Sequence, residues 1–179
     1  MQQKIVITGG PGTGKSTVIN ELEKRGFHCI HEISRQVTLE ARKKGIEQLF
    51  LTNPLLFSEM LLEGRTKQFI GASDKDAEII FFDRGIPDVF AYMDFTNSEY
   101  PSKFIESSKE HLYSTVFLMP PWKDIYTSDN ERYESYEESL EIYKHIKSAY
   151  SQLGYSIIEI PFGSVKERTD FVLESLLIK

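Results

Sequence analysis

The segment Gly9 to Ser16 constrains the fold of this chain more than any other, because it reads Gly-Gly-Pro-Gly-Thr-Gly-Lys-Ser. It matches G-x-x-x-x-G-K-[ST] at every fixed position, a motif that works between a β-strand and an α-helix. The β-branched run Lys4–Thr8 predicts the strand before it, as a buried parallel strand. Val18 and Leu22 have helical spacing after it, and Gly26 predicts the end of that helix. The segment therefore predicts an anion-binding loop between a strand and a helix.

The chemistry of this loop indicates a phosphate-binding site. Glycines let the backbone amides point toward an anion, and the following helix adds its positive end. Lys15, expected to be a solvent-facing ligand group, would reach the outer phosphates, and Ser16 would bind Mg²⁺. The alternative is an ordinary glycine-rich turn. The loop predicts ATP as the ligand, with GTP as the alternative, and the predicted nucleotide-binding residues are Gly9, Gly10, Pro11, Gly12, Thr13, Gly14, Lys15, Ser16 and Thr17.

Further strands and helices alternate along the chain, which predicts an α/β fold with a parallel sheet and helices on both faces. No repeat or linker interrupts the pattern, so we expect a single domain over residues 1–179. The further strands are predicted at His28–His31, Ala77–Phe82, Ser114–Met119 and Ser156–Ile160, and the further helices at Ile33–Lys44, from Asn53-Pro54 to about Ile70, from near Pro87, up to Gly154, and from the capping box at Ser164.

A stripe of apolar and aromatic residues marks the long helix that ends at Gly154. Its members recur at helical spacing, so packing against the core is favoured over a base-stacking platform. The stripe consists of Tyr136, Leu140, Tyr143, Ile146 and Tyr150.

Charge and composition exclude several classes of protein. The net charge of -6 argues against general nucleic-acid binding, which depends on a basic surface. No stretch approaches the roughly 20 apolar residues of a membrane helix, and the start of the chain lacks the pattern of a secretory signal. We therefore expect a cytoplasmic protein. The four histidines show no metal-ligand spacing, so Mg²⁺ is expected and structural zinc is not.

Polar residues follow the predicted strand at Ala77–Phe82. A carboxylate at Asp83 can hold Mg²⁺ directly or through water. Arg84 stands where many ATP-hydrolysing motors have a glutamate, and an arginine is suited to holding an anion. The alternative is that Asp83 caps the helix that starts near Pro87.

Four segments give the chain a resemblance to the adenylate-kinase-like branch of P-loop NTPases, in particular to small AAA-type predicted ATPase and kinase domains related to ribosylnicotinamide kinase. They are Ile5–Ser16, His31–Arg35, Phe82–Asp88 and Glu159–Gly163. The resemblance implies a five-stranded parallel sheet in the order 2-3-1-4-5. It also implies an acceptor site between helices at about 33–76, and a lid at about 120–136.

The resemblance also implies roles for individual residues. Glu32 would be the general base that takes the acceptor's proton, and Arg132 would contact phosphate from the lid, although the lid is unusually acidic. The alternative for Glu32 is a surface carboxylate paired with Arg35. The predicted catalytic residues are Lys15, Glu32, Asp83, Arg84 and Arg132; the acceptor-binding residues are Glu32, Arg35, Arg65, Arg84 and Asp88; and the metal ligands are Ser16 and Asp83.

Two functions fit this pattern. The first is an ATP-dependent kinase that phosphorylates a nucleoside, a nucleotide or a similar small metabolite. The second is a regulatory nucleotide-binding NTPase with slow hydrolysis and no acceptor. A G protein is disfavoured by the missing N/T-K-x-D motif, and a motor ATPase by Arg84 and by the absence of a second helical domain. The sequence indicates neither the acceptor's identity nor the oligomeric state.

Overall fold

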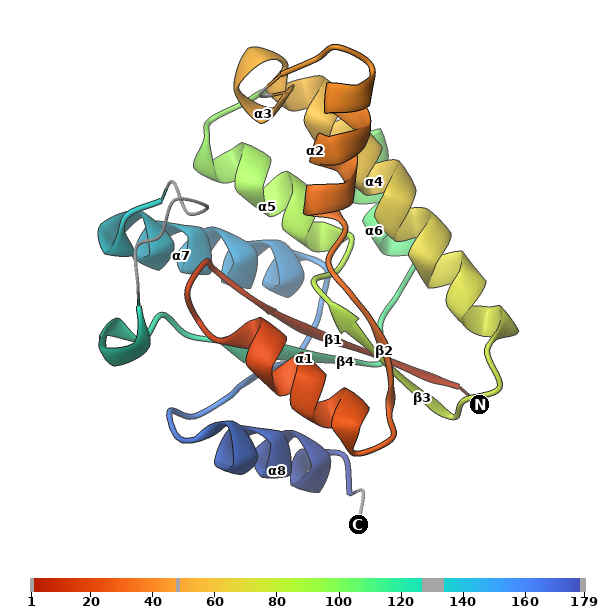
Figure 1. Ribbon diagram of the computed structural model, residues 1–179, viewed down its shortest axis with the longest axis vertical. Helices are drawn as coiled ribbons and strands as arrows, with labels where there is room; N and C mark the ends of the chain where they lie inside the picture. Colours follow the sequence, from red (N-terminus) through yellow and green to blue (C-terminus); the bar gives the residue numbers. More distant parts are fainter. Residues whose placement is uncertain (1, 48, 127–133, 178–179) are drawn as a thin grey trace.

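A five-stranded parallel sheet with strand order β2-β3-β1-β4-β5 forms the centre of the protein (Figure 1). The computed structural model describes residues 2–47, 49–126 and 134–177. Within the sheet, β1 pairs with β3 so that Ile7 lies opposite Asp83, and with β4 so that Gly9 lies opposite Met119. The predicted fold class and strand order are confirmed. The strands are β1 (Gln3–Gly9), β2 (His28–Ile30), β3 (Ile79–Asp83), β4 (Thr115–Met119) and β5 (Ile157–Glu159).

Helices cover both faces of the sheet (Figure 1), because successive side chains of each strand point to opposite sides. Ile5 and Ile7 of β1 pack in one core with α1 and α8, whereas Val6 between them packs in a second core with α4 to α7. The helices are α1 (Lys15–Lys24), α2 (Ser34–Lys43), α3 (Leu49–Thr52), α4 (Pro54–Gly71), α5 (Pro87–Phe95), α6 (Lys103–Glu110), α7 (Tyr136–Gln152) and α8 (Val165–Ser175), with short 3₁₀ helices η1 (Ala72–Asp74) and η2 (Lys123–Ile125).

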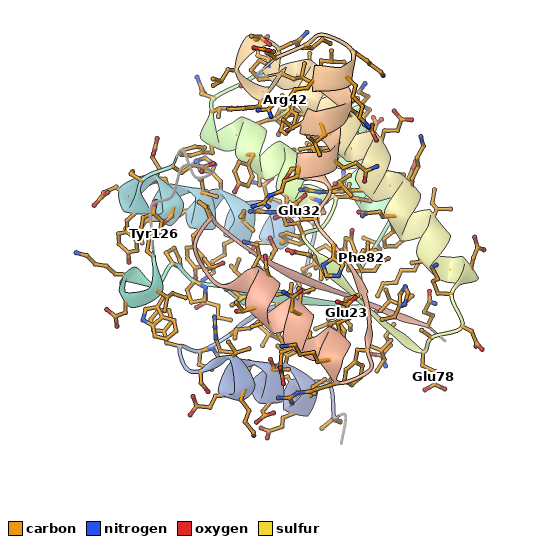
Figure 2. All side chains as sticks on the ribbon, in the orientation of Figure 1. Glu23, Glu32, Arg42, Glu78, Phe82 and Tyr126 are labelled. Atoms are coloured by element: carbon orange, nitrogen blue, oxygen red, sulfur yellow. The ribbon has the colours of Figure 1, made fainter. Side chains whose placement is uncertain are left out.

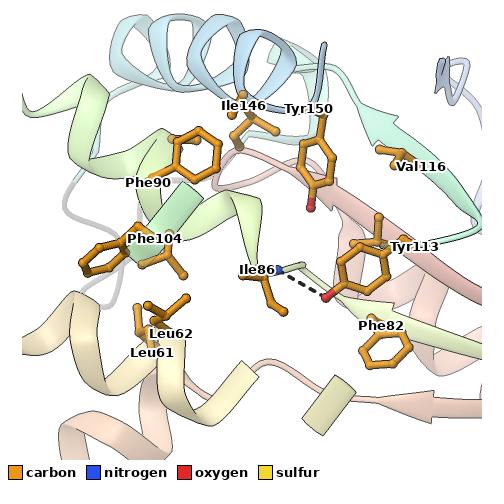
Figure 3. Packing of buried hydrophobic residues seen from close by; sticks show 14 of the residues in the cluster. Leu61, Leu62, Phe82, Ile86, Phe90, Phe104, Tyr113, Val116, Ile146 and Tyr150 are labelled. Carbon is orange, nitrogen blue, oxygen red and sulfur yellow. Dashed lines mark hydrogen bonds between the residues drawn. The ribbon is translucent and has the colours of Figure 1, made fainter. Parts of the chain in front are cut away.

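Side chains fill the space between the sheet and its helices (Figure 2). Phe82 is buried within β3, and Glu78, just before the strand, is exposed at the edge of the molecule. In the core under α5 and α7, the Ile86 amide donates a hydrogen bond of 3.2 Å to the Tyr113 hydroxyl (Figure 3). A Cβ at Gly85 would collide with the hydroxyl of Tyr150. The turn after β3 is therefore packed tightly against Tyr113 and Tyr150.

The helix caps agree with the sequence. The Asn53 side chain accepts a hydrogen bond of 3.1 Å from the Leu56 amide, and Ser164 forms a complete capping box with Glu167. Gly26 has a φ of 92°, as a left-handed residue after α1 requires. No helix in the described part of the chain combines the length and apolar character needed to cross a membrane.

Two predictions about helices differ from the structure. The predicted apolar stripe of the long helix includes Leu140, but that side chain is 38% exposed, because the packed face of α7 is centred on Ile142, Ile146 and Tyr150. Helix α6 was not predicted, because it is short and has only two apolar residues, Phe104 and Ile105, to mark its packed face.

Candidate functional site

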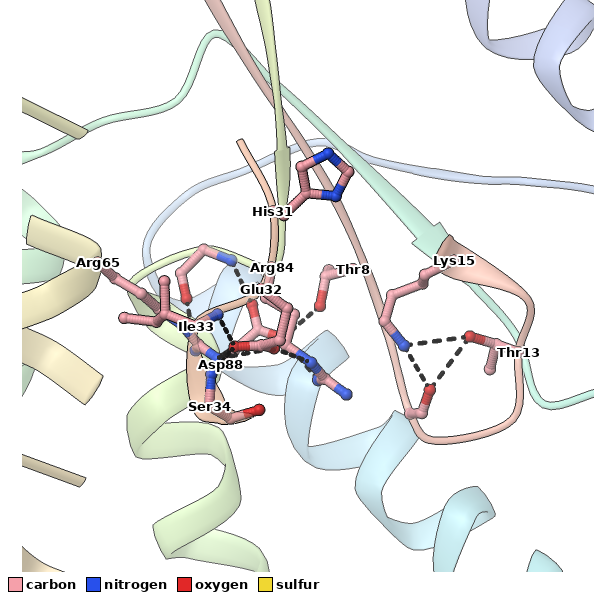
Figure 4. A network of polar contacts seen from close by, with 12 residues as sticks. Thr8, Thr13, Lys15, His31, Glu32, Ile33, Ser34, Arg65, Arg84 and Asp88 are labelled. Atoms are coloured by element: carbon pink, nitrogen blue, oxygen red, sulfur yellow. Dashed lines mark hydrogen bonds and ion pairs between the residues drawn. The ribbon is translucent and has the colours of Figure 1, made fainter. Parts of the chain in front are cut away.

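The phosphate loop connects β1 to α1 and holds its lysine in a folded position (Figure 4). Gly12 and Gly14 have φ values of 71° and 84°, a region that favours glycine. The Lys15 ammonium donates a hydrogen bond of 2.7 Å to the Gly10 carbonyl and one of 3.4 Å to the Thr13 hydroxyl. Lys15 is 8% exposed, so the expectation that it faces solvent is wrong in this structure. Burial and the nearby positive charge of Arg84 lower the pKa of Lys15 to about 7.

Asp83 ends β3 beside the loop and is buried, with 7% of its surface exposed. Its Oδ1 atom has no hydrogen-bond partner among the described residues, and burial raises the pKa of its carboxyl group. The alternative that Asp83 caps α5 is wrong, because the cap position is Ile86 and no side chain caps that end. An unpartnered buried carboxylate oxygen is a fitting ligand for a hard cation. Asp83 and the exposed Ser16 therefore offer oxygen atoms of the kind that suits Mg²⁺.

Asp83→Asn is expected to lower activity chiefly through the metal, because the amide keeps the size of the side chain but loses the charge that attracts Mg²⁺. Raising the Mg²⁺ concentration should partly restore the rate. The measurement is nucleotide turnover as a function of Mg²⁺, with Asp74→Asn, at an exposed position of η1, as the matched control. A variant that equals wild type at limiting Mg²⁺ would remove Asp83 from the metal site.

Glu32 follows β2 and lies at the centre of an ion-pair network (Figure 4). Its carboxylate accepts hydrogen bonds from the amides of Ile33 and Ser34 at 2.9 and 3.1 Å. Arg65 Nη2 contacts both carboxylate oxygens at 3.0 and 3.1 Å, and Arg84 Nε lies 2.6 Å from Oε2. Burial alone would raise the pKa of Glu32, but the two guanidinium groups outweigh it and lower this pKa to about 2.

Asp88 forms a second anchor beneath this network. Its carboxylate has no exposed surface and accepts hydrogen bonds from the Thr8 hydroxyl, from the Tyr150 hydroxyl at 2.7 Å and from the Gly85 amide at 3.0 Å. Arg84 Nη1 lies 3.4 Å from Oδ1 of the same carboxylate. Asp88 therefore ties β1, the turn after β3 and α7 to one side of the Arg84 guanidinium.

The backbone of Arg84 is also fixed. Its φ of 71° is uncommon for a residue with a side chain, and its amide donates a hydrogen bond of 3.0 Å to the Ile7 carbonyl of β1. Glu32 and Asp88 hold the guanidinium, and Arg65 Nη1 donates to the adjacent Gly85 carbonyl at 3.0 Å. Arg84 is thus pre-oriented before any ligand arrives.

A cavity of about 700 Å³ opens over this network, between α2, α4 and α5. Pro11 of the phosphate loop borders it, so the cavity and the loop adjoin each other. Its floor is charged and most of its walls are apolar. Glu32 lies near the centre of the molecule, whereas Arg42 lies at the outer end of α2 (Figure 2). Of the predicted acceptor residues, Glu32, Arg35, Arg65 and Arg84 line the cavity, whereas Asp88 lies beneath its floor with no exposed surface. The apolar residues among its walls are Leu39, Phe50, Phe57, Leu61, Val89 and Met93.

Sequence reasoning missed one functional candidate and named another that the structure does not describe. Arg168 of α8 donates a hydrogen bond of 3.1 Å to the Thr13 carbonyl of the loop. No sequence signal distinguishes it, because arginines are routine on helix surfaces. Arg132, predicted to contact phosphate, lies outside the described residues together with the rest of 127–133. Of the predicted lid, Glu134 lines the cavity.

Comparisons with solved structures identify the fold. Deoxyadenosine kinase from M. mycoides, solved with dCMP and dCDP, is 18% identical with a TM-score of 0.73, and the match covers 98% of this chain and 99% of that one. NadR protein in complex with NR is 15% identical with a TM-score of 0.76, and the match covers 99% of this chain and 52% of that one. At these identities the comparisons show a shared fold, the fold of P-loop kinases.

Sequence comparisons identify the family. A UPF0200 protein of Thermococcus kodakarensis is 44% identical over 45 residues, which covers 24% of this chain, and the match spans only 23% of that relative's length. The profile of an AAA domain family matches residues 4–168. Because this match runs from β1 to α8 and includes the phosphate loop, Glu32 and the turn after β3, the chain belongs to this AAA domain family.

Proposed function

We propose that this protein is a kinase that transfers a phosphoryl group from Mg·ATP to a nucleoside, a nucleotide or a similar small metabolite. The observation that supports it best is the cavity of about 700 Å³ that adjoins the phosphate loop. Its size suits a small molecule, and its combination of apolar walls with converging charged groups such as Glu32 and Arg84 is typical of ligand sites. The kinases that share the fold are consistent with this activity.

In this proposal, catalysis depends on positioning and electrostatics. Lys15 and the loop amides bind the outer phosphates, and Ser16 and Asp83 hold Mg²⁺. The metal, when bound, supplies positive charge against the phosphate oxygens. Arg84, already held in place by Glu32 and Asp88, stabilises the charge on the group in transfer without reorganising. Arg132 of the lid is proposed to contact the same phosphates.

Glu32 is the proposed general base. Its pKa of about 2 keeps the carboxylate ionised at neutral pH, so it can accept a hydrogen bond from the acceptor hydroxyl. Such a weak base takes the proton late, once bonding to phosphorus has made the hydroxyl more acidic. The Glu32 carboxylate therefore first orients the acceptor and afterwards receives its proton.

A screen of acceptors tests the proposal. Nucleosides, nucleotides and vitamin-derived ribosides would be incubated with Mg·ATP, and ADP would be measured against a background without acceptor. We expect at least one acceptor class to raise ADP release, and the phosphorylated product to be detected by mass spectrometry. ADP release that no acceptor changes would count against the kinase and favour the regulatory NTPase.

A further inference from the structure

Arg168 is a buried cation whose partners are unusual. It is 5% exposed, and among the described residues no carboxylate forms an ion pair with it. Its Nε atom has no hydrogen-bond partner there, and Nη1 donates only to the Thr13 carbonyl. Burying a guanidinium without a counter-ion is costly, so this arrangement calls for a compensating role.

The contact with Thr13 fixes the orientation of one peptide group in the phosphate loop. The described chain has no cis peptide bond, and in a planar trans peptide the C=O and N–H groups point in opposite directions. The Thr13 carbonyl points to Arg168 on α8, so the Gly14 N–H points away from α8. In an anion-binding loop the amides must converge on the ligand, and one reversed amide would present a carbonyl oxygen instead.

Glycine makes such a reversal easy at this position. Gly14 has a φ of 84° and lacks a Cβ that would oppose rotation of the preceding peptide. The guanidinium lies directly against this backbone, since a Cβ on Gly14 would lie 2.6 Å from Arg168 Nη1. The loop therefore gains its flexibility from glycine and a fixed orientation from Arg168.

An aromatic ring also contacts Arg168. The guanidinium carbon lies 5.8 Å from the centroid of the Trp122 ring. Trp122 stacks on Phe162 with ring centroids 5.0 Å apart and an interplanar angle of 21°. Trp122 is the only tryptophan of the chain, so its fluorescence reports on this contact. Segments that follow β4 and β5 thus support an arginine that contacts the phosphate loop.

We propose that Arg168 is a positioning residue for nucleotide binding, which holds the Thr13–Gly14 peptide so that the Gly14 amide faces the phosphates. The inference rests on the proposed role of the loop, but it concerns binding and does not require an acceptor. Losing one amide contact to a charged phosphate should raise the Kd for Mg·ATP by about 10- to 100-fold.

Three variants test this, with Mg·ATP binding measured by calorimetry. Arg168→Met should show the full loss, and Arg168→Lys, which keeps a donor, should recover part of it. The matched control is Arg25→Met, because Arg25, the C-cap residue of α1, contacts Asp170 of α8 at 2.6 Å and so joins α1 to α8 at a distance from the loop. This control should bind within about twofold of wild type, as expected for a partly exposed ion pair.

Kinetics and fluorescence separate positioning from stability. Arg168→Met should alter Trp122 emission and raise the KM for ATP with little change in kcat, the pattern of lost uniform binding. If Arg168→Met binds Mg·ATP like wild type although its Trp122 emission is altered, the inference about Arg168 is overturned and the proposed function is unaffected. Wild-type protein that binds neither Mg·ATP nor Mg·GTP would overturn the proposed function as well. If thermal melting shows that Arg168→Met does not fold, the test uses Arg168→Lys instead. Wild-type affinity for Mg·ATP together with altered Trp122 emission in Arg168→Lys would refute the positioning role.

Discussion

Lys15→Ala is expected to weaken Mg·ATP binding and to lower turnover by roughly 10²- to 10³-fold, the usual effect of removing one fixed donor from a developing charge. Lys15 reaches into the loop, where its ammonium contacts the Gly10 carbonyl. Folding should be preserved, because burial disfavours the charged amine and its removal relieves that cost. Calorimetry with Mg·ATP and measurement of ADP release would test both effects.

The matched control for this variant is Lys24→Ala, at the last turn of the same helix, where the side chain is exposed. It should bind nucleotide like wild type. Unchanged affinity and activity in a folded Lys15→Ala protein would contradict the assignment of residues 9–16 as a phosphate-binding loop.

Glu32→Gln is expected to reduce phosphoryl transfer to an acceptor by roughly 10²- to 10⁴-fold, the range typical of losing a general base, while nucleotide affinity changes little. The amide cannot receive the acceptor's proton, and it loses the charge that holds Arg65 and Arg84. The measurement requires an acceptor found by the screen, since hydrolysis uses water as its nucleophile and involves a different proton transfer. Background hydrolysis should therefore survive the substitution.

Two further variants assign the cause of that reduction. Glu63→Gln, on the exposed face of α4, removes a carboxylate that pairs with Lys67 and should leave transfer unchanged. Arg65→Met removes one support of Glu32 but leaves the carboxylate in place. If Arg65→Met lowers the transfer rate as much as Glu32→Gln does, Glu32 acts by organising the arginines. A normal transfer rate in Glu32→Gln would refute both the base role and the organising role of Glu32.

The sheet was predictable because its strands carry a strong local signal. Aromatic and β-branched residues at Ile79–Asp83 can fill a buried central strand. The phosphate-loop motif specifies the strand before the loop, β1, and the helix after it, α1. The weaker elements depend on tertiary packing. Helix α6 contributes little apolar surface, and the packed face of α7 is set by neighbouring helices, so the apolar pattern predicts a core position for Leu140 although it is exposed.

The convergence of the site was predictable in part. Residues that follow neighbouring parallel strands meet at one edge of the sheet, which brings Glu32 close to Arg84. The pairing of Glu32 with Arg65 was not predicted, because 33 residues separate them and only the packing of α4 brings them together. Arg168 lies 155 residues from its partner Thr13, a separation over which local sequence carries no information.

The cavity between α2, α4 and α5 combines a fixed floor with walls of a different character. Arg84 is bonded through its backbone to β1, and the side chain of Asp88 is bonded to Thr8, so the charged floor is part of the sheet's own framework. Phe57 and Leu61, in contrast, come from α4 and offer the cavity apolar surface without charge. Under the proposed function, substitutions on these walls would change which metabolite fits while Glu32 and Arg84 keep their positions. Such a division lets a lineage of proteins acquire new substrates by small steps, and it marks the walls as the place to redesign specificity.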